Sequence, residues 1–187
     1  MVRGTTPDNL ARGLSLQPMQ TFDNCITEEV TNQLFRTTNP FGLDLISLNI
    51  QRARDHGLST YNQVRELCHL GRARNFEDLL QEMSPETIRK LRSVYEHVDD
   101  IDLFIGGVSE ESVPDAVLGP TFLCIIGDQF TRLKRGDRFF YEFGGHAASF
   151  TEDQLEEIRQ TSFARILCDN TEVGEMQPLA FVRPSFA

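Results

Sequence analysis

The stretch that decides the fold is DLISLNIQRARDHGLSTYN, residues 44–62. At helical spacing, one face of it carries four residues at i, i+3, i+4 and i+7, namely Leu45, Leu48, Asn49 and Arg52. A helix that only covers a core would place apolar side chains at all four positions. The amide and the guanidinium are therefore either satisfied polar groups inside a helical protein or contacts to a bound molecule.

A flat, apolar cofactor with charged edges fits the second interpretation. Leu45 and Leu48 would pack on its plane, and Arg52 would bind a carboxylate at its rim through charge-assisted hydrogen bonds. Asn49 would orient a ligand side chain through that side chain's second ring nitrogen. Haem, a planar macrocycle with propionates that an axial histidine usually holds, matches this description.

The composition narrows the class of protein. A length of 187 residues suits one domain, and the formal net charge is −10. Nucleic-acid binders usually carry a basic stripe, and the sequence has none, so we expect no nucleic-acid partner. No apolar run approaches the roughly 20 residues that cross a bilayer, and the N-terminus lacks the apolar stretch of a signal peptide.

The four cysteines, Cys25, Cys68, Cys124 and Cys168, have no CxxC or CxxxH spacing. We therefore expect no zinc site. The spacing leaves two interpretations open, which are four buried thiols or one or two long-range disulfides in an exported protein.

Helix start and stop signals recur along the chain and predict a mainly α protein. Residues 1–24 are expected to be irregular, and IDLFIGGVSEES (101–112) is expected to be a loop because of its glycine pair. RFFYEF (138–143) is the one candidate strand. The expected helices are 25–36, 45–54, 61–68, 76–80, 85–95, 120–135, 152–160 and 163–170.

Four blocks in a fixed order carry a resemblance: LDLISLNIQRARDHGLSTYNQVRELC, IDLFIGGVSE, GPTFLCIIGDQFTRLKRGDRFFYE and RILCDNT. Together they resemble the C-terminal portion of the animal-type haem peroxidases, the superfamily of myeloperoxidase, peroxidasin, peroxinectin and the chorion peroxidases. The resemblance runs from about Leu14 to Thr171. It implies a multi-helical fold with little or no β structure, and an intact protein that reduces hydrogen peroxide and oxidises a halide or small organic donor.

The resemblance also implies that six residues contact haem or line its proximal pocket: Leu34, Phe35, Leu45, Leu48, Asn49 and Arg52. In the family, the residue at Asn49 hydrogen-bonds the axial histidine, and the residue at Arg52 lies near a propionate. Leu34 and Phe35 are expected to end the preceding helix. His56 matches a structural histidine in a turn between two helices, and not the iron ligand.

The family's distal histidine and arginine, axial histidine, calcium loop and haem-linking acids all precede the region that this chain resembles. We therefore expect neither a catalytic residue nor a metal ligand here, and a chain that alone neither binds haem tightly nor turns over peroxide. The expected organisation is one C-terminal segment of a catalytic domain, with a lead-in (1–24), a matching region (25–171) and a tail (172–187). The resemblance also implies secretion.

The resemblance gives the cysteines a further interpretation. It pairs Cys68 with Cys124 in a disulfide, which in the chain-entropy model contributes about 4 kcal/mol to the free energy of unfolding. Cys168 is then either free or paired with Cys25.

Arg135-Gly136-Asp137 spells RGD, an integrin-recognition tripeptide, and suggests an alternative function. On this alternative the chain is a non-catalytic adhesion protein of peroxinectin type. The simpler interpretation is a helix C-terminus, with Arg135 at the negative helix end and Gly136 in a left-handed cap.

Overall fold

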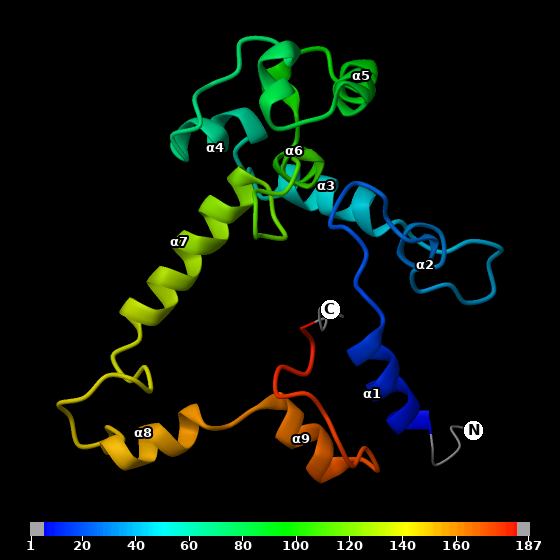
Figure 1. Cartoon of the computed structure of the whole chain (residues 1–187). Coiled ribbons are helices and arrows are strands. Elements are labelled where there is room, and N and C mark those ends of the chain that lie inside the picture. Colours follow the sequence, from blue (N-terminus) through cyan, green and yellow to red (C-terminus); the bar gives the residue numbers. More distant parts are fainter. Residues whose placement is uncertain (1–5, 183–187) are drawn as a thin grey trace. The chain divides into compact units, whose positions relative to one another are not determined.

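The structure, a computed structural model, describes residues 6–182 and builds them from helices (Figure 1). The expected mainly α class is confirmed, and no strand forms within the described residues. The only β pairing there is an isolated antiparallel bridge between Leu34 and Leu43. The elements are α1 Thr6–Leu16, α2 Glu28–Thr31, α3 Leu45–Asp55, α4 Tyr61–Leu67, η1 Phe76–Gln81, α5 Pro85–Val94, η2 Val98–Asp100, α6 Leu103–Ser109, α7 Pro120–Gly136, α8 Glu152–Arg159 and α9 Phe163–Asn170.

The chain divides into two compact units. The larger unit is Thr21–Leu133, and the smaller one combines the N-terminal segment up to Gln20 with the segment from Lys134 onward. None of the helices in residues 6–182 combines the length and the apolar character that crossing a membrane requires.

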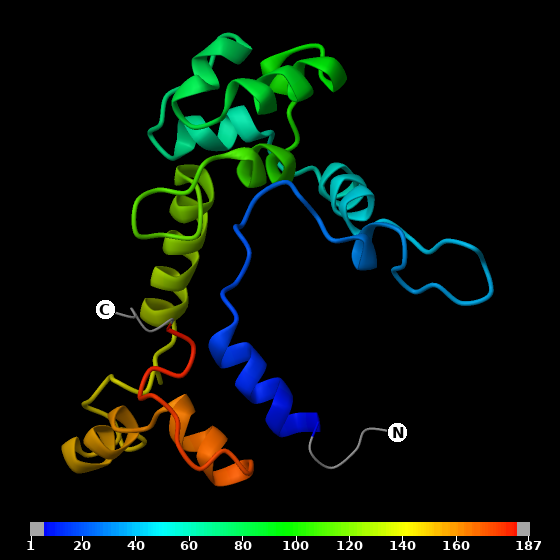
Figure 2. The same cartoon turned by 45° about the vertical axis from the view of Figure 1, so that its right-hand side comes forward.

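The core of the larger unit lies among α4, η1, α5 and η2. Figures 1 and 2 show these elements gathered in one part of the chain. Tyr61, Leu79 and Ile101 are completely buried there. The partly buried Tyr95 and Ile105 pack against this core, which brings the start of α6 into the same cluster.

Local capping explains where most helices begin. The carboxylate of Asp44 accepts hydrogen bonds from the backbone N–H groups of Ile46 and Ser47, at 2.8 and 3.1 Å, and so starts α3. The same chemistry confirms the other expected starts. The capping residues are Asn75 for η1, Ser84 for α5, Thr151 for α8 and Ser162 for α9.

Helix α6 forms where a loop was expected, and its two glycines explain the difference. A Cβ on Gly106 would lie 2.2 Å from Cγ of Tyr61, and one on Gly107 would lie 2.2 Å from Cε1 of Phe122. The glycines therefore allow the helix to approach two aromatic rings closely. Packing outweighs the poor helix propensity of glycine at these positions.

The helix expected over 25–36 is wrong in its extent, since α2 spans only Glu28–Thr31. The chain turns back instead of continuing the helix. The N–H of Leu43 donates to the carbonyl of Leu34 at 2.8 Å, and the N–H of Gly42 donates to that of Asn32. The apolar residues of this segment therefore belong to a hairpin-like turn and not to a longer helix.

Two further expectations are wrong, the first of them only in part. The expected irregular lead-in, residues 1–24, contains the helix α1 at Thr6–Leu16; residues 17–24 are irregular as expected, and residues 1–5 lie outside the described residues. The buried Asp8 of α1 accepts a hydrogen bond from the N–H of Glu172 at 2.9 Å. Residues 138–143 form consecutive turns and not a strand. The N–H of Phe143 donates to the carbonyl of Phe140 at 2.8 Å, which is turn pairing.

Candidate functional site

The candidate site is a groove in the larger unit, with a volume of about 560 Å³. It lies between the C-terminal half of α3, the start of α6 and the first turn of α7, which meet in Figures 1 and 2. The lining residues are Asn49, Arg52, Ala53, His56, Leu58, Leu103, Phe104 and Phe122.

The groove has no acidic residue in its lining, although the chain carries a formal net charge of −10. The guanidinium of Arg52 makes neither an ion pair nor a hydrogen bond with any residue in 6–182, and the carboxamide of half-buried Asn49 makes no hydrogen bond there. By contrast, Arg54 pairs with Asp102. An apolar groove with an unpaired cation and an unpaired amide suits an apolar molecule with anionic groups at its edge.

Leu45 and Leu48 belong to the same helix but lie outside the groove lining. Because α3 is unbroken from Leu45 to Asp55, they share a stripe with Asn49 and Arg52, one to two turns earlier. Leu45 is half-buried, and Leu48 is 38% exposed. The structure therefore brings Asn49 and Arg52 of the predicted face together in the groove. It leaves the two leucines of that face partly exposed to solvent.

Leu34 and Phe35 do not end a helix, which corrects the expected geometry of this pair. Leu34 lies in the bridge to Leu43, directly before the Asp44 cap of α3. Phe35 is 78% exposed and has a φ of 52°, in the left-handed region that costs a non-glycine residue roughly 1–2 kcal/mol. Neither side chain lines the groove.

His56 is the C-cap of α3 and lies in the turn before α4, as expected. Its side chain also lines the groove, which the sequence did not indicate. Phe104 and Phe122 were missed as well; their ring centroids lie 6.4 Å apart. The signal that could have identified Phe104 is its position in IDLFIGGVSE, one of the blocks that carry the family resemblance.

A disulfide joins Cys68, at the end of α4, to Cys124 in α7, with their Cα atoms 6.0 Å apart. The expected pairing is confirmed. Because Cys124 follows Phe122 by two residues, the bond also fixes the part of α7 that lines the groove. Cys25 and Cys168 are free thiols in the described part of the chain.

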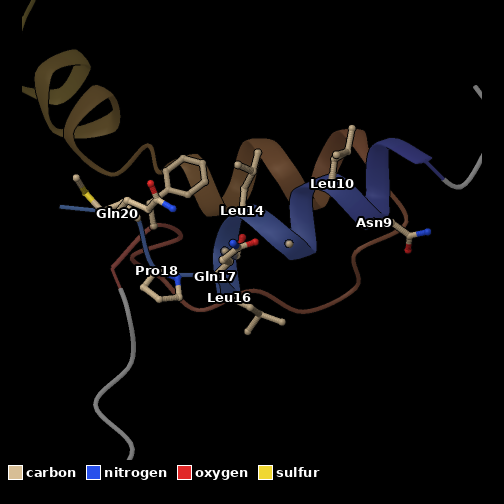
Figure 3. A pocket seen from close by; sticks show the side chains of 11 residues that line it. Asn9, Leu10, Leu14, Leu16, Gln17, Pro18 and Gln20 are labelled. Atoms are coloured by element: carbon tan, nitrogen blue, oxygen red, sulfur yellow. The ribbon is translucent and has the colours of Figure 1, made fainter. Parts of the chain in front are cut away.

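The smaller unit has a larger cavity of about 850 Å³, lined mainly by α1 and residues 17–20. Figure 3 shows Leu10 and Leu14 projecting from the same side of α1. The lining contains no ionisable side chain. This cavity therefore offers apolar contacts and neutral hydrogen-bonding groups but no charged side chain, and we do not treat it as the functional site.

The RGD tripeptide is exposed, but two of its three residues are helical. Arg135 and Gly136 form the end of α7, and the carboxylate of Asp137 accepts a hydrogen bond from the N–H of Phe139 at 2.8 Å. Gly136 is not among the glycines with positive φ, so the expected left-handed cap is wrong. The expectation of a helix C-terminus is confirmed.

Known proteins match this chain both in sequence and in fold. The family model described as animal haem peroxidase matches residues 1–181. The chain is 48% identical over 179 residues to "Peroxidase" of Drosophila melanogaster and 46% identical over 181 residues to "Chorion peroxidase" of the same species. These alignments cover 95% and 94% of the chain, but 26% and 22% of the relatives.

A solved structure, Peroxidase A from Dictyostelium discoideum, matches with a TM-score of 0.78 and 34% sequence identity. The match covers 95% of this chain and 33% of that one. The chain thus spans about a quarter of the length of the curated relatives quoted above. On the family match and these identities, the chain belongs to the animal haem peroxidase family.

Proposed function

We propose that this chain forms the proximal wall of the haem pocket of a peroxidase that reduces hydrogen peroxide and oxidises a small organic or halide donor. The observation that carries the proposal is the groove beside α3. It has an apolar lining, no acid, and an arginine and an amide that pair with nothing in residues 6–182. The names of the two Drosophila relatives, "Peroxidase" and "Chorion peroxidase", support the same activity.

The residues of the groove fit haem by their chemistry. Arg52 offers a guanidinium to a propionate, and Phe104 and Phe122 offer apolar surface. Leu45 and Leu48 extend the apolar stripe along α3. When bound, haem supplies the iron that exchanges electrons with peroxide.

The proposal also assigns a role to the side chain of Asn49. Its carboxamide oxygen accepts the N–H of the imidazole that binds the iron, which fixes the orientation of that ring and raises its basicity. We assign that imidazole to another part of the protein, because none of the four histidines of this chain matches the family's ligand position. Likewise, we assign the proton transfers on peroxide and the family's calcium site elsewhere.

The conformation of Phe35 supports the idea that another part of the protein covers this wall. The Phe35 ring is 78% exposed, so its contacts within this chain compensate little for the cost of its left-handed backbone. In the proposal, this ring and Leu34 line the proximal pocket in the intact protein. On its own, the chain then binds haem weakly and does not turn over peroxide.

We also propose that the protein acts outside the cell. The Cys68–Cys124 bond supports this location, because disulfides form and persist mainly in secreted proteins.

The test is a chimera in which this chain replaces the matched segment of the Drosophila Peroxidase. The proposal expects a haem spectrum and peroxidase activity from the chimera. Asn49→Ala then raises the reduction potential of the iron, because the imidazole loses the acceptor for its N–H. Arg52→Gln weakens haem retention. Spectroelectrochemistry and haem-loss kinetics measure the two effects.

Arg89→Gln is the matched control, because Arg89 is also exposed and makes no ion pair within the described residues, but lies on α5 away from the groove. It should change neither the potential nor the haem-loss rate. If Asn49→Ala and Arg52→Gln behave like this control, the groove is not the haem wall. A strong Soret band and peroxidase activity from the 187-residue chain alone would also contradict the assignment.

A further inference from the structure

Arg54 and Asp102 form the only hydrogen bonds that join α3 to α6 or its N-cap in residues 6–182. Nε and Nη2 of Arg54 donate to the two carboxylate oxygens of Asp102, at 2.9 and 2.7 Å. The hydroxyl of Tyr95 donates to the same carboxylate at 2.7 Å. The side chain of Asp102 is only 9% exposed, so its charge is largely withdrawn from water.

This cluster of Arg54, Asp102 and Tyr95 lies directly behind one wall of the groove. A second cavity, of about 350 Å³, is lined by Arg54 and Asp102 and also by Ala53, Leu58 and Leu103. The last three residues line the groove as well. One layer of side chains therefore separates the charged cluster from the groove.

Arg52 and Arg54, the two arginines of the QRARD segment (51–55), lie on different sides of α3. Residues two apart on a helix point about 200° apart, so Arg52 and Arg54 project to opposite sides of α3. Arg52 faces the groove, and Arg54 faces Asp102. The position of Arg52 relative to Leu103 and Phe104 therefore depends on how α3 is held against α6.

We propose that the Arg54–Asp102–Tyr95 cluster is a positioning device that fixes α3 against α6 and so sets the width of the groove between Arg52 and Phe104. The two-point geometry of the guanidinium and the carboxylate restrains distance and orientation together, which a lysine could not do. Without Arg54, the largely buried carboxylate keeps one side-chain hydrogen-bond donor, the Tyr95 hydroxyl, and water enters to hydrate it. The inference depends on the proposed function only for the identity of the ligand that binds in the groove.

The experiment uses the full 187-residue chain without a ligand. Nuclear Overhauser contacts between the side chains of α3 and Phe104 report the width of the groove. Hydrogen exchange of the α3 amides reports how firmly the helix is held. Arg54→Gln should weaken the contacts across the groove and speed α3 exchange by about tenfold, with α5 amides unchanged. Arg54→Lys keeps the charge without the planar fork, and should restore the exchange rate only in part.

A control variant makes the outcome decisive. Arg132→Gln removes an exposed i,i+4 pair with Asp128 on α7 and should not change the contacts across the groove. If Arg54→Gln keeps those contacts, the positioning role is wrong, whether or not the chain loses stability. If Arg54→Lys matches the wild type in both measurements, a positive charge alone holds α3 against α6, and the planar geometry of the guanidinium has no role. Because no measurement involves haem, failure of the proposed function would leave this result unaffected.

Discussion

Asn62 and Ala73 are joined by two hydrogen bonds arranged like those between paired strands. The carboxamide nitrogen of Asn62 donates to the carbonyl of Ala73 at 2.8 Å, and its oxygen accepts the N–H of Ala73 at 2.9 Å. The same nitrogen donates to a carboxylate oxygen of Asp99 at 2.6 Å. Because Asn62 is completely buried, this one side chain satisfies the backbone of a segment that belongs to no helix.

Asn62→Ala should therefore destabilise the chain strongly. The change leaves the N–H and the carbonyl of Ala73 buried without partners, which costs about 2–4 kcal/mol of unfolding free energy. Urea denaturation followed by circular dichroism measures the loss. Asn32→Ala is the control, since Asn32 is exposed and its side chain makes no hydrogen bond within the described residues. Equal effects of the two changes would show that the Asn62 bonds contribute little.

Gly106 and Gly127 both lie in helices, but only Gly106 has a close neighbour. A Cβ on Gly106 would overlap the Tyr61 ring, whereas a Cβ on Gly127 would meet nothing within 4 Å. Gly106→Ala should cost about 1–3 kcal/mol because the ring has to shift. Gly127→Ala should raise stability by up to about 1 kcal/mol through helix propensity. Opposite shifts of the thermal midpoint are expected, and a gain from Gly106→Ala would contradict the packing described for α6.

The sequence predicted what depends on neighbouring residues. Capping is local, and the helices expected to begin at residues 45, 85 and 163 do begin there, capped by Asp44, Ser84 and Ser162. Periodicity likewise grouped Asn49 with Arg52, and both line the groove. Cap chemistry and helical spacing involve residues at most seven apart, so they could be recognised without a structure.

What the sequence could not predict depends on distant contacts. Gly106 and Gly107 indicate a loop by propensity, and only the closeness of Tyr61 and Phe122 explains why they are helical. For the same reason Phe104 was missed as a groove residue. The helix expected through Leu34 fails because the chain returns at Gly42, which the spacing of apolar residues does not show.

The Arg54–Asp102 pair predicts a dependence of stability on pH. Hydrogen bonds from Arg54, and then from Tyr95, hold the pKa of Asp102 below its usual value. A carboxylate with a lowered folded-state pKa contributes stability that is fully present above the unfolded-state pKa of about 3.9. That contribution is lost as the pH falls through the folded-state pKa.

Asp102→Asn should therefore lower the free energy of unfolding by about 1–2 kcal/mol at pH 7. This figure is reduced for solvent screening, because Arg54 is 60% exposed. The loss should become smaller as the pH falls below about 4. Denaturant unfolding of both proteins between pH 7 and pH 2.5 measures the difference. Asp128→Asn, in an exposed pair, should stay within about 0.5 kcal/mol of the wild type at pH 7. A difference for Asp102→Asn that grows toward low pH would contradict the sign.

The RGD tripeptide should not support cell attachment through integrins. Arg135 and Gly136 are held in α7, and Asp137 is engaged by the N–H of Phe139, so the three residues do not form a displayed loop. We expect cells to attach equally to surfaces coated with wild type and with Asp137→Glu. Attachment that both a free RGD peptide and Asp137→Glu abolish would favour the adhesion alternative.

The Cys68–Cys124 disulfide should be the main covalent source of stability in the larger unit. It closes a sequence separation of 56 residues, for which the chain-entropy model gives about 4 kcal/mol of unfolding free energy. Cys124→Ser should lower the thermal midpoint strongly, and a reducing agent should do the same to the wild type but not to the variant. Cys25→Ser and Cys168→Ser are the controls, because both thiols are free. Peptide mapping without reduction that finds Cys68 linked to any other cysteine would overturn the pairing, and with it the fixed place of Phe122 in the groove.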